Sequence, residues 1–455
     1  MKVSRELIAR YDTPGPRYTS YPTAPSWSND FGEADYRRHL IRAGSSAERL
    51  SMYVHVPFCE RLCLYCGCSV VITRQRDRMH DYVSRVLQEA RLAHDALGSA
   101  RPVVQHHWGG GTPTFLSPTE LERLFTGLVA LFPLDENAEV SIEIDPAVTT
   151  IEQLDVLRTC GFNRISMGVQ DFDAKVQETV HRIQSVEATR LLVDHARALG
   201  FLSVNLDLIY GLPHQTPESF GHSVDQVLKL RPERIACYGY AHVPWLKKHQ
   251  RALPEDALPR GHDKIELYLT AYRKFREAGY EAIGMDHFAL PQDAMMRALA
   301  DGTLHRNFMG YAVHPAEDML SFGASSISEI NAAFAQNHKG LKDWSEAIDT
   351  GRLPIDRGLT RSADDTARRR IILDLMCRFR LDYDAHGGAA AFRKRYADAL
   401  VQLEPLANDG VVELDDNGIR VTELGQLFVR NAAMPFDAYL AKQRAQGGPM
   451  FSRTV

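Results

Sequence analysis

The sequence predicts an α/β protein whose main part is a partial (β/α)6 barrel of the TIM type. It also predicts an N-terminal arm and a small, mainly helical C-terminal domain. Two observations carry the barrel prediction. From residue 51 onward, short runs rich in β-branched residues alternate with longer segments of helical apolar spacing, and the strand–helix unit recurs six times. Such alternation predicts a parallel sheet covered by helices. A doubly wound sheet is the alternative arrangement of the same elements.

Each unit of this pattern has a predicted strand and most have a following helix. The predicted strands cover residues 52–57, 103–108, 139–144, 164–169, 203–209 and 235–240. The predicted helices cover residues 80–97, 118–132, 151–160, 186–199 and 217–230. In either fold, functional residues are expected at the carboxyl ends of the strands.

The first 50 residues are interpreted as an arm. The stretch 12–22 carries three prolines and a glycine, and proline removes a backbone donor and fixes φ, which excludes a regular helix there. The arm is either a surface strap or a segment that covers a site. Residues 51–363 are then assigned to the catalytic barrel.

Residues 364–455 are predicted to form a winged-helix-like domain. A long helical pattern at 367–380 is followed by two strand-like segments, 410–414 and 418–421, around a turn-rich stretch, and another helix is expected from Thr422. Because the whole chain is acidic, packing against the barrel is favoured over DNA binding as the role of this domain.

The bulk composition indicates a soluble cytoplasmic enzyme. Of 455 residues, 44% are hydrophobic and 24% charged, and the net charge of −5 argues against general nucleic-acid binding. No apolar run approaches the roughly 18 residues needed to cross a bilayer, and the first residues lack the apolar core of a signal peptide. Seven cysteines without such a signal favour a reducing compartment.

Three cysteines follow the first predicted strand as Cys59-x3-Cys63-x2-Cys66. Three thiolates can hold three irons of a [4Fe–4S] cluster and leave the fourth iron open, whereas structural clusters commonly use four cysteines. Cys68 adds a fourth thiol, so a zinc site is an alternative, as are buried cysteines without a ligand. Structural zinc sites draw their ligands from two separated knuckles, which these closely spaced cysteines do not form. A redox-active cluster is therefore the favoured interpretation.

Polar or glycine-rich residues also mark the next four strands: positions 109–114 follow the second, Glu143 lies at the end of the third, Gln170 closes the fourth, and Asp207 lies inside the fifth. Glycines let a backbone approach a ligand closely, and an isolated carboxylate on an apolar strand calls for a cationic partner such as an ammonium group. Arg182 can reach a ligand carboxylate or cap a helix. Singly, each residue has a structural explanation; together they predict a mouth lined with ligand-binding groups.

The cysteine loop, the glycine-rich strand end and the six units resemble the radical S-adenosylmethionine (SAM) superfamily. Within it, the chain is similar to the oxygen-independent coproporphyrinogen III oxidases, also called coproporphyrinogen dehydrogenases. The resemblance runs almost end to end. The segments that carry it are 14–22, 53–59, 66–68, 107–114, 306–308 and 428–431.

The resemblance implies a [4Fe–4S] cluster and two molecules of SAM. Cys59, Cys63 and Cys66 would ligate the cluster, with Cys68 beside it, and Tyr53, His55 and Glu143 would act in catalysis. The first SAM, at the open iron, would contact Tyr53, Gly110, Glu143 and Ile327. The second would contact Tyr65, Gly111, Thr112, Gln170, Arg182, Asp207 and Ala241.

The implied reaction is the anaerobic oxidative decarboxylation of two propionate side chains of coproporphyrinogen III to vinyl groups, giving protoporphyrinogen IX in haem biosynthesis. A 5′-deoxyadenosyl radical made from SAM would start each round. The implied partners are the substrate and a low-potential electron donor such as flavodoxin or ferredoxin, with a monomeric protein and neither nucleic acid nor membrane. Arg17 and Arg306 are candidates for binding the substrate carboxylates.

The chain departs from the family pattern at Ser69, where asparagine is usual, at Met309, where glutamine is usual, and in segment 321–325, which has less glycine. Two alternative functions are open, and the departures at Ser69 and Met309 bear on the second of them. One is a haem chaperone of the same superfamily. The other is a different radical enzyme that uses two SAM molecules for methyl transfer, cyclopropanation or tetrapyrrole modification.

Overall fold

The computed structural model describes residues 3–314, 316–445 and 451–454. Within them, the main sheet has twelve strands in the order β16-β15-β14-β13-β1-β4-β5-β6-β7-β8-β10-β9. Its centre is the predicted set of six parallel strands, so the partial barrel is confirmed. These strands are β1 (Leu50–Val56), β4 (Val103–Gly110), β5 (Leu134–Ile144), β6 (Arg164–Gln170), β7 (Ser203–Tyr210) and β8 (Arg234–Gly239).

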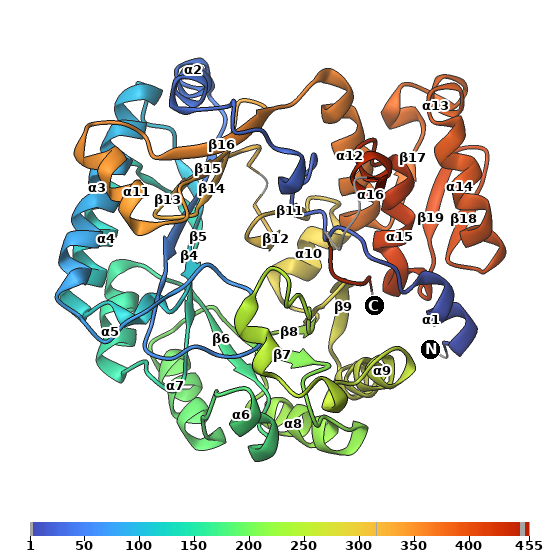
Figure 1. The fold of residues 1–455 in the computed structure, drawn as a ribbon, viewed down its shortest axis with the longest axis horizontal. Coiled ribbons are helices and arrows are strands. Elements are labelled where there is room, and N and C mark those ends of the chain that lie inside the picture. The colour runs from blue at the N-terminus through green and yellow to red at the C-terminus, as the bar shows by residue number, and fades with distance from the viewer. Residues whose placement is uncertain (1–2, 315, 446–450, 455) are drawn as a thin grey trace.

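Helices form the outer layer around these strands (Figure 1). They are α3 (Arg78–Leu97), α4 (Pro118–Leu131), α5 (Ile151–Cys160), α6 (Ala174–Thr179), α7 (Val186–Ala198), α8 (Pro217–Leu230) and α9 (His262–Glu277). Local sequence sets several of their boundaries. Ser117 caps the start of α4 in a capping box with Glu120, and Pro118 occupies the first helical position. Helix α5 ends where Gly161 adopts a left-handed backbone conformation.

The sheet continues beyond the predicted strands on both sides. Beside β1 lie β13 (Asp318–Phe322), which is parallel to it, and then three antiparallel strands, β14 (Ile327–Ile330), β15 (Ala333–Asn337) and β16 (Ile355–Thr360). Beside β8 lie β10 (His287–Ala289) and β9 (Glu281–Gly284). Further elements are α10 (Ala294–Ala300), α11 (Leu341–Asp349) and the hairpin of β11 (His305–Asn307) and β12 (Gly310–Ala312).

The first 50 residues contain two helices, α1 (Arg5–Tyr11) and α2 (Glu33–Ala43), with an irregular stretch between them. That stretch lies against the C-terminal part of the chain. The buried guanidinium of Arg430 donates hydrogen bonds to the carbonyls of Gly15 and Pro16, and Tyr18 donates to Asp437 at 3.1 Å. The region predicted as an arm is therefore anchored along its irregular stretch.

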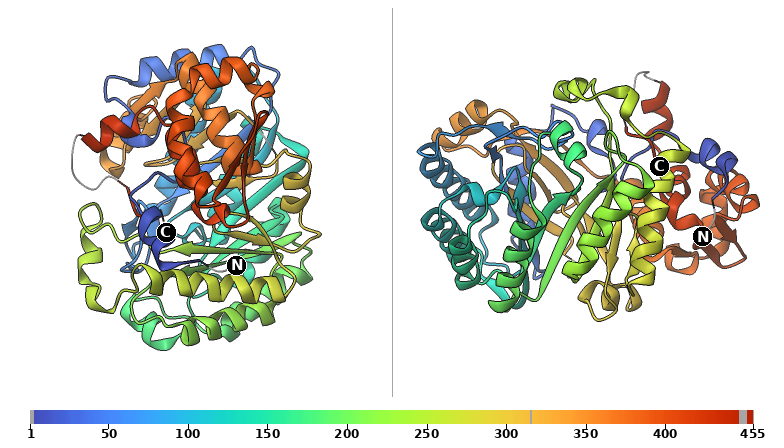
Figure 2. Two further views of the ribbon diagram at one scale, coloured as in Figure 1. Left: turned by 90° about the vertical axis from the view of Figure 1, so that its right-hand side faces the viewer. Right: turned by 90° about the horizontal axis from the view of Figure 1, so that it is seen from below.

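The C-terminal residues form a helical group with a second hydrophobic core (Figure 2). It contains α12 (Ala363–Arg378), α13 (Ala389–Arg395), α14 (Ala397–Asn408), α15 (Val429–Ala433), α16 (Leu440–Ala445) and a sheet ordered β17-β19-β18. The strands are β17 (Arg380–Asp382), β18 (Val412–Leu414) and β19 (Gly418–Val421). The helical segment expected from Thr422 begins at Gly425 instead, and the Thr422 hydroxyl accepts the Gly425 amide at 3.0 Å.

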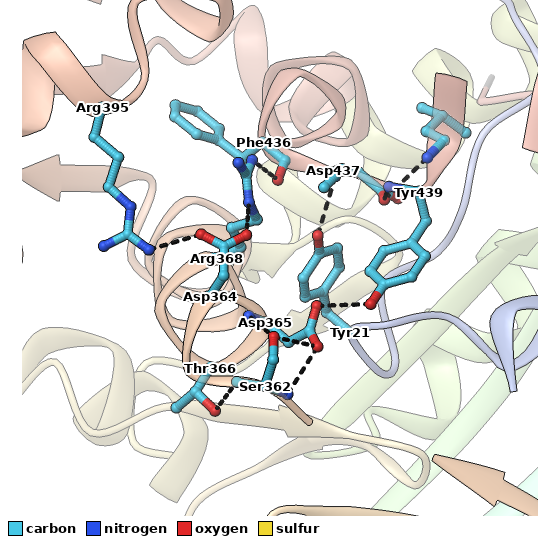
Figure 3. A network of polar contacts seen from close by, with 12 residues as sticks. Tyr21, Ser362, Asp364, Asp365, Thr366, Arg368, Arg395, Phe436, Asp437 and Tyr439 are labelled. Atoms are coloured by element: carbon cyan, nitrogen blue, oxygen red, sulfur yellow. Dashed lines mark hydrogen bonds and ion pairs between the residues drawn. The ribbon is translucent and has the colours of Figure 1, made fainter. Parts of the chain in front are cut away.

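A polar network at the start of α12 ties this group to the N-terminal stretch (Figure 3). Ser362 caps the helix, and Asp365 accepts hydrogen bonds from Ser362 and from the Tyr439 hydroxyl at 3.0 Å. Tyr21 in turn accepts the Ala438 amide at 3.0 Å.

None of the helices in the described ranges is long and apolar enough to span a membrane.

Candidate active site

The cysteine loop lies at the carboxyl end of β1, as the sequence predicted. It leaves the barrel through β2 (Phe58–Cys59) and returns through β3 (Val71–Ile72), which pairs with β2 in parallel. A second segment holds the loop from outside. His249 donates to the Cys66 carbonyl at 2.9 Å, and Gln250 donates to the Tyr65 carbonyl at 3.0 Å. The loop therefore has a defined shape set by contacts on both of its sides.

Cys59, Cys63 and Cys66 all line a cavity of about 450 Å³. None of them is in a disulfide. The Cys59 thiol lies 3.5 Å from the Thr112 hydroxyl, Arg182 Nη1 lies 3.7 Å from Cys63 Sγ, and Cys66 Sγ accepts the Cys68 amide at 3.4 Å. Each of the three sulfur atoms thus has a polar neighbour at hydrogen-bonding range.

This donor set fits a [4Fe–4S] cluster. In the part of the chain that the structure describes, no group of three or more His, Cys, Asp or Glu side chains converges to hold a single metal ion. The thiolates of a cluster each bind a different iron, so they need not meet at one point. The three cysteines around one cavity are the residues that would hold the cluster.

The glycine-rich end of β4 lets this strand approach β1 closely. Gly110 has φ +114°, and a Cβ there would lie 2.5 Å from the His55 ring. A Cβ on Gly111 would lie 2.6 Å from the Pro57 carbonyl carbon. Gly110 and Gly111 also line the cavity. The glycines are therefore required by the protein's own packing as well as being placed where a ligand would touch them.

Glu143 lies at the centre of the site. Its carboxylate accepts the Gly110 amide at 3.2 Å and lies 3.5 Å from Nε2 of His107, whose Nδ1 lies 2.7 Å from the Ser141 hydroxyl. Burial raises the pKa of Glu143, but the hydrogen bond and charge of His107 and the Gly110 amide outweigh it and hold that pKa below its ordinary value. The ionised carboxylate suits an ammonium group.

Arg182 and Gln170 present unpaired polar atoms at the same cavity. Arg182 donates to Asp145 at 3.0 Å and to the Gly168 carbonyl at 2.5 Å, while its Nε is buried without a hydrogen-bond partner. Gln170 has φ +68°, and its buried Oε1 also lacks a partner. Burying such atoms costs free energy unless a ligand or water satisfies them, so these two residues support a polar ligand here.

Asp207 has an unusual environment for a carboxyl group. Burial and the negative charge of Glu143 raise the pKa of Asp207 to about 7, although hydrogen bonds from Asn205 and Ser166 oppose the rise. Asn205 donates to Asp207 at 2.6 Å. With its pKa near neutral pH, this carboxyl group can accept a hydrogen bond from a ligand hydroxyl when it is ionised, or donate one to it when it is protonated.

A second cavity of about 700 Å³ adjoins the first, and Gly67, Cys68 and Glu143 line both. Tyr53 and His55 lie in its wall. Tyr53 donates to His55 Nδ1 at 3.0 Å, and His55 Nε2 donates to the Ser69 carbonyl at 2.9 Å. The contact to position 69 is made by the backbone, so the serine side chain is not needed for it.

The structure places every residue predicted to hold the cluster, to contact SAM or to act in catalysis on one of these two cavities. The first holds the three cluster cysteines with Tyr65, Gly110, Gly111, Thr112, Gln170, Arg182, Asp207 and Ala241; the second holds Tyr53, His55 and Ile327; Glu143 faces both.

The two arginines expected at substrate carboxylates lie elsewhere. Arg17 forms an ion pair with Asp286. Arg306 is buried, with its guanidinium over the Tyr311 ring at 4.8 Å. Neither lines the two cavities around the cysteine loop. The ion pair of Arg17 joins segments far apart in the sequence, so the sequence pattern could not reveal it.

Sequence reasoning also missed residues that shape the site. His107 and Asp145 lie within or beside the predicted strand ends, and those positions could have marked them. Lys247, His249 and Gln250 follow the last parallel strand in a loop with no recognisable pattern, so only the folded chain reveals that they hold the cysteine loop.

Comparison with known proteins adds an independent line of support. Residues 53–227 match the family model for the radical SAM superfamily, and residues 362–428 match the model for the HemN C-terminal domain. An oxygen-independent coproporphyrinogen III oxidase from Salmonella typhimurium is 44% identical over 453 residues, covering 99% of this chain and 98% of that protein. One from Escherichia coli is 43% identical over 458 residues, with 99% and 98% covered.

A solved structure agrees with these matches. Coproporphyrinogen III oxidase (HemN) from Escherichia coli, described as a radical SAM enzyme, superposes with a TM-score of 0.90 at 41% identity, covering 96% of this chain and 99% of that one.

Proposed function

This chain belongs to the family of oxygen-independent coproporphyrinogen III oxidases, and from that premise we propose that it converts two propionate side chains of coproporphyrinogen III to vinyl groups, giving protoporphyrinogen IX for haem biosynthesis. The observation that carries the proposal is the shared wall between the two cavities. The cysteines open onto one cavity, Tyr53 and His55 onto the next, and Glu143 onto both. A radical generated in the first cavity would form beside a substrate in the second.

The chain's own residues supply the setting for this chemistry. When bound, the cluster and SAM supply a 5′-deoxyadenosyl radical that removes a hydrogen atom from a propionate, after which loss of carbon dioxide and one electron leaves a vinyl group. Cys59, Cys63 and Cys66 would hold the cluster. Glu143 would bind an ammonium group, because its carboxylate is ionised and faces the cavity.

The linings of the two cavities support a stoichiometry of two SAM molecules. We assign the first molecule to Gly110 and Glu143 in the first cavity together with Tyr53 and Ile327 in the second. We assign the other molecule to a second group in the first cavity: Tyr65, Gly111, Thr112, Gln170, Arg182, Asp207 and Ala241. The unpaired atoms of Gln170 and Arg182 belong to the second group. Tyr53, His55 and Glu143 are the proposed catalytic residues.

The remaining assignments follow from the same proposal. The domains are an arm at 1–50, a catalytic barrel at 51–363 and a C-terminal domain at 364–455. The start of α12 at Ala363 supports the last boundary, although the hydrophobic core of the C-terminal domain also takes in residues of the arm and of segment 283–313. The protein would act as a monomer in the cytoplasm and receive electrons from a low-potential donor such as flavodoxin or ferredoxin.

The direct test is anaerobic incubation of the iron-loaded protein with dithionite, SAM and coproporphyrinogen III, followed by mass spectrometry of the tetrapyrrole. The proposal predicts two successive losses, each of one carbon dioxide and two hydrogen atoms, with methionine and 5′-deoxyadenosine formed alongside. Cleavage of SAM with an unchanged tetrapyrrole would contradict the proposal and favour another radical reaction.

A further inference from the structure

Lysines and apolar side chains both line the second cavity. Leu246, Phe308, Met309 and Ile327 contribute the apolar part, Lys247, Gln336 and Lys339 contribute polar groups, and the Glu143 carboxylate is the acidic group in the lining. A volume of about 700 Å³ lies in the range of pockets that enclose a small organic ligand. The lining therefore suits a ligand with an apolar body and an anionic edge.

The cations come from three segments that the fold brings together. Lys339 follows β15 by two residues, Arg357 lies on β16 opposite Gln336, and Lys247 lies in the loop after β8. Their charges interact: the pKa of Lys339 is lowered by partial burial first, and then by the positive charges of Arg357 and Lys247. Lys339 and Lys247 line the cavity, whereas Arg357 lies beside its lining residue Gln336. Like charges held this close disfavour each other unless an anion joins them.

The cations are only partly neutralised by the protein. Asp356 is the carboxylate near Lys339, and it already lies 3.4 Å from His338. Lys247 donates to the Cys68 carbonyl at 2.8 Å, and Arg357 Nε donates to Gln336 Oε1 at 2.8 Å. Within the described ranges, no ion pair uses the ammonium group of Lys339 or Lys247, or the guanidinium of Arg357.

The proposed reaction requires the protein to bind carboxylates of the substrate that do not react. The substrate carries four propionates, and the product keeps two of them, so two carboxylates must be held through both rounds while the others react. A carboxylate forms charge-assisted hydrogen bonds with ammonium and guanidinium groups. An apolar wall of the kind found here would contact the macrocycle.

We propose that Lys339, Lys247 and Arg357 form a carboxylate-recognition site that holds propionates of the tetrapyrrole while the reacting propionate faces Tyr53 and His55. This inference rests on the proposed function, because it takes the tetrapyrrole as the ligand of the second cavity. It replaces Arg17 and Arg306 as the candidates for substrate carboxylates.

The main test uses Lys339→Met, because Lys247 also holds the cysteine loop. The probes are coproporphyrin III, which is fluorescent and carries four carboxylates, and its tetramethyl ester, which has the same ring and no charge. We expect the dissociation constant of coproporphyrin III to rise about tenfold in Lys339→Met and its salt dependence to weaken, with ester binding unchanged. Lys339→Arg keeps the charge and should bind nearly as the wild type does.

The matched control is Lys342→Met. Lys342 is exposed on α11, three residues from Lys339, and pairs with Glu346 at 3.8 Å rather than lining the cavity. It should bind both probes as the wild type does. Equal binding of coproporphyrin III by the wild type, Lys339→Met and the double variant Lys339→Met/Arg357→Met would overturn the inference. Equal loss for acid and ester would also overturn it, since a charge-recognition site cannot act on the ester.

Turnover separates this inference from the proposed function. In dithionite-driven assays, Lys339→Met should raise KM for coproporphyrinogen III while iron content and cleavage of SAM stay at wild-type levels. If the wild type decarboxylates the substrate and the variants show an unchanged KM, the recognition site is wrong and the proposed function stands. If the wild type fails to decarboxylate, the proposed function itself is wrong.

Discussion

The Glu143 carboxylate accepts a hydrogen bond from the Gly110 amide at 3.2 Å, beyond the last backbone pair of β4 and β5, which is Trp108 with Ile142. A side chain therefore continues the connection between these strands where their ladder ends. The same carboxylate faces both cavities. The close packing of β1, β4 and β5 at this point sets the position of the group proposed to bind SAM.

Replacing Gly110 with alanine should disrupt the site. The new Cβ would meet the His55 ring in a backbone with φ +114°, so His55 must move and lose its hydrogen bonds to Tyr53 and Ser69. We expect stability to fall by about 1–3 kcal/mol from overpacking and activity by about 100-fold from misplacement. Thermal unfolding and the turnover assay measure the two effects.

Gly98→Ala is the control for backbone strain alone. Gly98 has φ +68° at the end of α3, and a Cβ at this position would meet no atom within 4 Å. The variant should lose stability by about 1 kcal/mol and keep its activity. Full activity in Gly110→Ala would show that the close approach of β4 to β1 does not matter for the reaction.

Two cysteine variants should distinguish a cysteine that ligates the cluster from one that only lies beside it. Cys63→Ser removes one of the three thiols proposed to ligate the cluster, so we expect loss of most cluster iron and of activity after anaerobic reconstitution. Cys68→Ser should keep the cluster, because the other three cysteines remain. Iron and sulfide analysis with electron paramagnetic resonance measures both. A full cluster and protoporphyrinogen from Cys63→Ser would be incompatible with the assigned ligand set.

Arg430→Met should release the N-terminal stretch. Arg430 is buried and donates to the carbonyls of Pro16 at 2.9 Å and Arg453 at 3.0 Å, as well as to Gly15. Its loss would leave these carbonyls unpaired, at a cost of about 1–3 kcal/mol. Limited proteolysis should then cut within residues 12–22 faster than in the wild type. The exposed Arg91, on the outer helix α3, gives the control Arg91→Met, which should leave the cleavage rate unchanged.

The acid stability of the protein should depend on His106. This buried ring accepts the Trp108 indole N–H at 2.7 Å, and burial lowers the pKa of His106 to about 3. The unfolded chain, with an ordinary histidine pKa near 6.5, binds the proton first as the pH falls. The free energy of unfolding should therefore fall between about pH 6.5 and 3, by up to about 1.4 kcal/mol per pH unit for this group.

Urea unfolding at pH 7 and pH 5 measures this dependence. His106→Gln cannot take up the proton, so the free energy of unfolding should differ less between pH 7 and pH 5 in this variant. Part of the difference should remain, because burial also lowers the pKa values of His287 and His305. His222→Gln, at an exposed position, should leave the difference unchanged. An unaltered difference in His106→Gln would show that His106 does not bear on acid stability.

The sequence predicted the parts of the fold that repeat. The six parallel strands are short runs with many buried apolar residues, they alternate with helices, and the cysteine loop follows the first of them, so both could be placed from local pattern. Strands β14 to β16 could not, because their buried faces carry polar residues. Glu329 is buried only because Arg361 and Arg369 pair with it, and these partners lie more than thirty residues away. The cations at the second cavity could not be predicted either, because they come from segments that lie far apart in the sequence.

The open iron can be observed by Mössbauer spectroscopy of the iron-57-loaded protein, prepared without oxygen, before and after addition of SAM. Three thiolate ligands predict one iron that differs from the other three and whose signal changes when SAM binds. Four equivalent irons that do not respond to SAM would mean that side chains cap every corner of the cluster, and the proposed chemistry would have no place to start.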